Sequence, residues 1–122
     1  MRAQFVRHSK NPLDSLEIGH ARERRMEKVK EDMTNVMNRL FVLYGDHLAH
    51  PYKSTGKSEY EMGFSQERKE GISNSYSLKY DDEEKTFEVY VIPGNNKSPK
   101  AKQHSTLGEC IGDIKKWIEE YK

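Results

Sequence analysis

Between residues 26 and 44, apolar residues recur at spacings that alternate between three and four. They are Met26, Val29, Met33, Val36, Met37, Leu40, Leu43 and Tyr44. This is the period of one face of an α-helix. The pattern predicts a long amphipathic helix from about His20 to Tyr44, which Gly45 ends in a left-handed cap. Because residues 40–44 are apolar nearly all round, we expect other parts of the chain to cover that end on more than one side.

Three later segments alternate apolar with polar residues, which is typical of half-buried β-strands. Their apolar positions are Tyr60, Met62 and Phe64, then Ile72, Tyr76, Leu78 and Tyr80, and finally Phe87, Val89 and Val91. The polar residues 46–56, with Pro51 and Gly56, predict a loop before the first strand, and residues 94–105 predict a loop after the third.

The last segment begins with a capping box, Thr106-x-x-Glu109, in which the hydroxyl and the carboxylate satisfy backbone amides at a helix start. The helix behind it has one apolar face, formed by Leu107, Cys110, Ile111, Ile114, Trp117, Ile118 and Tyr121. A long helix, a three-stranded antiparallel sheet and a C-terminal helix predict a two-layer α+β domain. We assign residues 1–19 to an N-terminal arm and residues 20–122 to this single domain.

The predicted core draws on both helices and on all three strands. Its members are Met33, Val36, Met37, Leu40, Ile72, Leu78, Phe87, Val89, Val91, Ile111, Ile114 and Trp117. Apolar residues make up 34% of the chain and charged residues another 34%, so we expect this core to be small and the surface to be heavily solvated.

Charge and cysteine content narrow the functional classes. A net charge of +1 gives no global attraction to nucleic acid or to an anionic membrane. The single cysteine, Cys110, excludes an internal disulfide and a thiol cluster for zinc, and its place on the apolar helix face predicts a buried, inert thiol. No apolar run is long enough to span a membrane, and no secretory signal opens the sequence. We therefore expect a cytoplasmic protein.

The sequence predicts neither a metal nor another cofactor, and no catalytic residue. His47-x-x-His50 supplies two imidazoles, but no further ligands at metal-binding spacing accompany them. Gly56-Lys57-Ser58 matches the end of a phosphate-binding loop, yet the position that requires the first glycine is Pro51, which has no amide hydrogen to donate.

Two charged segments are the predicted contact surfaces for a protein partner. One is an acidic turn, formed by Asp81, Asp82, Glu83 and Glu84. Carboxylates on a rigid hairpin can take the place of phosphates in a basic channel, although acids at such a turn can also simply solvate it. The other is the charged first half of the long helix, with the basic residues Arg22, Arg24 and Arg25.

Phe5-x-Arg7 and the stretch Asn11-Pro12-Leu13-Asp14-Ser15-Leu16-Glu17-Ile18-Gly19 resemble the opening of many small proteins encoded by bacteriophages and related mobile elements. The resemblance implies an accessory factor of such an element. Our leading hypothesis is a non-catalytic interaction protein that binds and blocks a host protein or nucleoprotein complex, as an anti-defence inhibitor does. The apolar end of the long helix also leaves a homodimer open.

Two alternatives come from other classes. The order of helix, three strands and helix resembles the double-stranded-RNA-binding domain, in which a lysine-rich segment meets phosphates; here that segment would be Lys97, Lys100 and Lys102. The stretch from Gly45 to Pro51 resembles the histidine-bearing segment of small toxin ribonucleases. That resemblance implies His47 or His50 as a general base, with Lys53 or Lys57 near the phosphate.

Overall fold

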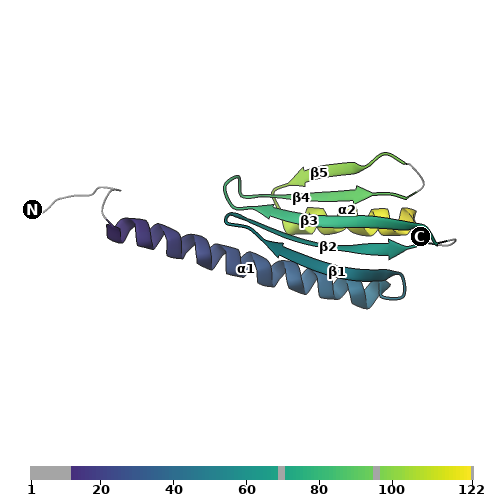
Figure 1. Cartoon of the computed structure of the whole chain (residues 1–122), viewed down its shortest axis with the longest axis horizontal. Coiled ribbons are helices and arrows are strands. Elements are labelled where there is room, and N and C mark those ends of the chain that lie inside the picture. Colours follow the sequence, from purple (N-terminus) through teal and green to yellow (C-terminus); the bar gives the residue numbers. More distant parts are fainter. Residues whose placement is uncertain (1–11, 69–70, 95–96, 122) are drawn as a thin grey trace, which may run out of the picture.

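The computed structural model describes residues 12–68, 71–94 and 97–121. Its elements in chain order are α1 (Pro12–Tyr44), β1 (Leu48–Thr55), β2 (Glu59–Glu67), β3 (Ser73–Asp81), β4 (Thr86–Ile92), β5 (Lys100–His104) and α2 (Leu107–Glu120). The strands form one antiparallel sheet in the order β1-β2-β3-β4-β5 (Figure 1). The α+β class and the terminal helices are confirmed, but the sheet has five strands where three were predicted.

Helix α1 begins earlier than its apolar pattern predicts. It starts at Pro12, a residue whose fixed φ suits the first helical position. The predicted start near His20 is therefore wrong, because residues 12–19 are already helical. The part of the arm at residues 1–11 lies outside the described residues. Figure 1 shows that the first turns of α1 extend past the end of the sheet.

The two strands that sequence analysis missed, β1 and β5, are the edge strands of the sheet. Pro51 does not prevent β1 from pairing, since the register breaks between Ala49 and Tyr52 and His50 takes a φ of 54° there. Such an irregularity at an edge accommodates a residue that cannot donate to the ladder. Strand β5 carries the exposed segment Lys100–Lys102, so it has no apolar alternation to mark it.

Both helices cover the same face of the sheet. The strand residues in the hydrophobic core occupy alternate positions and therefore share one face: Tyr60, Met62, Phe64, Tyr76, Leu78, Tyr80, Val89 and Val91. The same core includes Met26, Met33, Val36, Met37 and Leu40 of α1, and Cys110, Ile114, Trp117 and Ile118 of α2. The molecule thus has two layers, and no described element covers the opposite face of the sheet.

Most of the predicted core residues are buried as expected. Phe87 and Ile111 are half-buried against the core, and Ile72 is half-buried just before β3 begins. The expectation for the end of α1 is wrong, because Val42 is 84% and Leu43 is 59% exposed. The chain turns away after Tyr44 and leaves that side of the helix in solvent.

Two polar side chains, Gln66 and Asn74, lie fully buried on the helix side of the sheet. The Gln66 side chain is fully buried and donates from Nε2 to the carbonyl oxygen of Ile118 at 2.9 Å. Its Oε1 accepts hydrogen bonds from Asn74 Nδ2 at 3.2 Å and from the Tyr76 hydroxyl. Gln66 therefore connects β2 and β3 to the last turn of α2, and its amide is satisfied as a buried polar group must be.

We expect Gln66→Leu to lower the free energy of unfolding by about 3 kcal/mol, because a buried carbonyl and two buried donors lose their partner. Chemical denaturation followed by tryptophan fluorescence measures the change. Gln103→Leu, on the exposed strand β5, is the matched control and should change stability by less than about 0.5 kcal/mol. Equal losses in the two variants would contradict the role assigned to Gln66.

Candidate interaction surfaces

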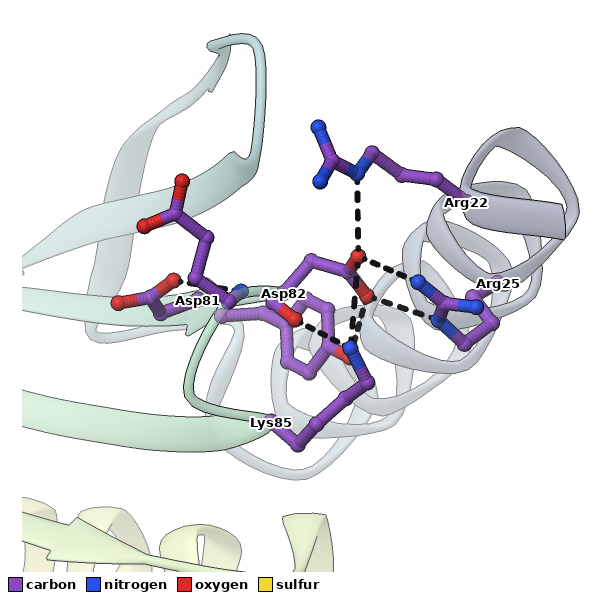
Figure 2. Close-up of polar contacts among 7 residues, drawn as sticks. Arg22, Arg25, Asp81, Asp82 and Lys85 are labelled. Carbon is purple, nitrogen blue, oxygen red and sulfur yellow. Dashed lines mark hydrogen bonds and ion pairs between the residues drawn. The ribbon is translucent and has the colours of Figure 1, made fainter. Parts of the chain in front are cut away.

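Asp82, in the turn after β3, is the centre of a polar cluster at one end of the sheet (Figure 2). Its side chain is only 1% exposed. Arg25 of α1 donates from Nε to Oδ1 at 3.1 Å and from Nη2 to Oδ2 at 2.9 Å, and the Tyr80 hydroxyl donates to Oδ1 at 2.9 Å. Arg22 Nε and Lys85 Nζ lie 3.6 and 3.7 Å from Oδ2.

These contacts keep the carboxylate of Asp82 charged. The hydrogen bonds from Arg25 are the largest cause and, with the Tyr80 hydroxyl, they lower the pKa of Asp82 from 3.8 to about 2 although burial opposes the shift. The backbone amide of Asp82 also donates to the carbonyl oxygen of Ser58, at 2.8 Å. The cluster thus fastens α1 to the β1–β2 and β3–β4 turns.

The seven predicted protein-contact residues differ in their contacts within the molecule. Arg22 and Arg25 contact the buried carboxylate of Asp82, although their own side chains are 39% and 43% exposed. The carboxylate of Asp82 is therefore directed away from any partner. Asp81 is half-buried and accepts a hydrogen bond from the amide of Glu83. The remaining three, Arg24, Glu83 and Glu84, are exposed. A contact role for these exposed residues stays a prediction.

The lysines named for nucleic acid binding lie on or beside β5 and contact α2. Lys100 Nζ is 3.1 Å from Glu120 Oε2, and Lys102 Nζ is 3.7 Å from Asp113 Oδ1. Lys97 Nζ lies 5.7 Å from the centre of the Tyr121 ring. The segment pairs as an edge strand with intramolecular partners for its lysines, which differs from the loop that the resemblance to the double-stranded-RNA-binding domain implies.

The histidines at the end of α1 are exposed. His47 lies in the turn before β1, and His50 lies in the irregular part of that strand. Within residues 12–68, 71–94 and 97–121, no group of three or more His, Cys, Asp or Glu side chains is arranged to hold a metal ion. Cys110 is fully buried as predicted, and burial raises the pKa of its thiol to about 12, which keeps it protonated at neutral pH.

The uncovered face of the sheet was missed by sequence analysis because its first strand was interpreted as a loop. We call it the open face: the side chains of β1 to β5 that point away from both helices. The register aligns Tyr52, Gly63, Ser77 and Tyr90 in one row across four strands. Tyr52, Ser77 and Tyr90 border a hollow of about 470 Å³ that Ile92 also lines. The side chains of Tyr52 and Ile92 are 47% and 45% exposed.

Tyr52 is held in place on this face. Its ring lies on Gly63, where a Cβ atom would approach Tyr52 Cε1 to 2.3 Å, so the row requires glycine there. The Tyr52 hydroxyl donates to Glu61 Oε2 at 2.6 Å. Burial and, secondarily, the Glu61 carboxylate raise the pKa of Tyr52 to about 12, so this hydroxyl remains a donor throughout the physiological range.

Comparison of the chain with protein-family models, with curated proteins and with solved structures finds no match in any of the three. Neither described helix is long and apolar enough to cross a membrane.

We expect Asp82→Asn to lower the free energy of unfolding at pH 7 by about 1–2 kcal/mol, because the pKa of this carboxyl is lower in the folded than in the unfolded chain. A lowered pKa means that the contribution is complete above about pH 4 and is lost as the pH falls through about 2. Denaturation curves for both proteins across this range measure it. Asp46→Asn, on the exposed turn after α1, is the control. A wild-type advantage that is independent of pH would contradict the assignment.

Proposed function

We propose that this protein is a non-catalytic interaction domain that binds a macromolecular partner through the open face and blocks the surface that it covers. The supporting observation is the one-sided arrangement of the core. Both helices pack on one face of a five-stranded sheet, while the opposite face presents Tyr52, Tyr90 and Ile92 around a wide hollow. An exposed apolar and aromatic patch bordered by polar residues is typical of protein interfaces.

The scaffold behind this face is suited to rigid binding. The Asp82 cluster fixes α1 against the turns at one end of the sheet, and Gln66 fixes the end of α2 to β2 and β3. Because these side chains are already hydrogen-bonded, the sheet needs little ordering when a partner binds. A preorganised surface of this kind can occlude a partner without performing any chemistry.

A narrower form of this proposal is that the protein acts as an anti-defence inhibitor, which binds and blocks a host macromolecule. Its support is the resemblance of the N-terminal segment to small phage-encoded proteins, and part of that segment, residues 1–11, lies outside the described residues. The test of the broader form does not depend on it, because it asks only whether the open face binds a protein.

The test is capture of a partner from a nuclease-treated bacterial lysate on the immobilised full chain, read by quantitative mass spectrometry. We expect Tyr90→Ser with Ile92→Ser to reduce the recovery of the captured protein at least tenfold, since central aromatic and aliphatic contacts dominate interface energies. The matched control is Val42→Ser with Leu43→Ser, which removes two exposed apolar side chains from α1 and should leave recovery unchanged.

Three results would overturn the proposal. The first is equal recovery with the open-face variant and the control, when circular dichroism shows both to be folded. The second is a captured protein that is recovered from an untreated lysate but not from the nuclease-treated one. That result would favour nucleic acid binding through Lys97, Lys100 and Lys102. The third is cleavage of RNA that His47→Ala or His50→Ala abolishes, which would favour the ribonuclease.

A further inference from the structure

The open face is acidic although the chain as a whole is not. Strands β2, β3 and β4 place six charged residues in outward positions, as their pairing register shows: Glu59, Glu61, Glu67, Lys79, Asp81 and Glu88. These are five carboxylates and one amine, on a chain whose net charge is +1. The outward residues of β5, Ala101 and Gln103, add no charge. Folding has therefore concentrated negative charge on the face that the helices leave open.

Lys79, the single lysine of this face, does not neutralise the two central carboxylates, Glu61 and Glu88. Lys79 stands opposite Glu61 on one side and opposite Glu88 on the other in the register. Its ammonium group, however, is paired with Glu59, at 3.6 Å. Glu61 accepts a hydrogen bond from the neutral hydroxyl of Tyr52, which leaves its charge in place. Glu88 forms no ion pair with any residue that the structure describes.

The row that holds Tyr52 and Tyr90 (the aromatic row) lies next to the row that holds Glu61, Lys79 and Glu88 (the acidic row). Along β2, Glu61 and Gly63 are two positions apart, and along β4, Glu88 and Tyr90 are two positions apart, so the rows are separated by about 7 Å. A guanidinium group can bond a carboxylate and still lay its plane on a neighbouring tyrosine ring, within the roughly 6 Å over which such contacts are favourable. Lysine offers the same charge with a more compact head. The two rows thus match a cationic side chain in both charge and shape.

From this arrangement we propose that the open face binds an arginine- or lysine-rich segment of a protein, with Glu61 and Glu88 contacting the cationic groups and Tyr52 and Tyr90 stacking on them. The inference rests on the proposed function and names the chemistry of its partner. A basic protein segment is also the kind of surface that ordinarily contacts nucleic acid phosphates, so the acidic face would compete for it.

Nucleic acid is the macromolecule that this face fits least. Phosphates would meet five carboxylates, and the cations offered for nucleic acid binding, Lys100 and Lys102, stand opposite Val91 and Val89 and therefore point to the helix side of the sheet. Attraction to a polycation and repulsion of a polyanion come from the same charges.

The test uses the full chain and two short fluorescent peptides, one alternating arginine with serine and one alternating glutamate with serine. Fluorescence anisotropy at low salt should show binding of the arginine peptide only, and added salt should weaken it. We expect Glu61→Gln with Glu88→Gln to reduce the affinity for the arginine peptide roughly fivefold. Both substitutions keep the side-chain shape, and the amide oxygen introduced at position 61 can still accept a hydrogen bond from Tyr52.

The control is Glu83→Gln with Glu84→Gln, which also removes two negative charges, but from the exposed β3–β4 turn. It should change the affinity less than twofold. Equal weakening by both double variants would overturn the inference, because binding would then follow net charge alone. Binding of the glutamate peptide, or of labelled single-stranded RNA, as tightly as the arginine peptide would overturn it as well.

The two proposals fail separately. If the lysate protein is lost with Tyr90→Ser and Ile92→Ser but is retained by Glu61→Gln with Glu88→Gln, the open face binds a partner that is not cationic, and only the present inference falls. If neither pair of substitutions affects recovery of the lysate protein, both proposals fall.

Discussion

The burial of one face of the sheet by both helices is the constraint on which the rest of the molecule depends. The strands supply an apolar row on one side only, and the apolar stripes of α1 and α2 need cover at the same time. When both helices pack on that row, all three apolar surfaces are buried in a single core. The consequence is an outer face of the sheet that no described element covers.

Polar contacts at the margins hold this two-layer arrangement in place. Asp82 fastens α1 to the turns at one end, and Gln66 fastens the last turn of α2 to the sheet. Lys100 and Lys102 add ion pairs between β5 and α2. Exposed pairs of this kind contribute little individually, whereas the buried groups are costly to leave unpaired. Several charges that look available in the sequence are therefore parts of the scaffold.

A small net charge can conceal a strong local field. The chain carries nearly equal numbers of acidic and basic residues, yet the strands sort them so that one face is predominantly acidic. Period-two alternation causes this sorting, because every second residue of a strand shares one side. Glu61 and Glu88 then lie in the register row next to the one that holds Tyr52 and Tyr90.

The sequence by itself determined the class of the fold, the two helices, the three inner strands and most of the core. Strong apolar periodicity at residues such as Met33 and Val89 marks burial regardless of context. Only the tertiary structure decided the edge strands, since β1 and β5 pair through backbone groups that carry no side-chain signal. It also decided that Asp82 lies inside and that Glu61 and Glu88 share a face, because strand register and the position of α1 bring together residues that are distant along the chain.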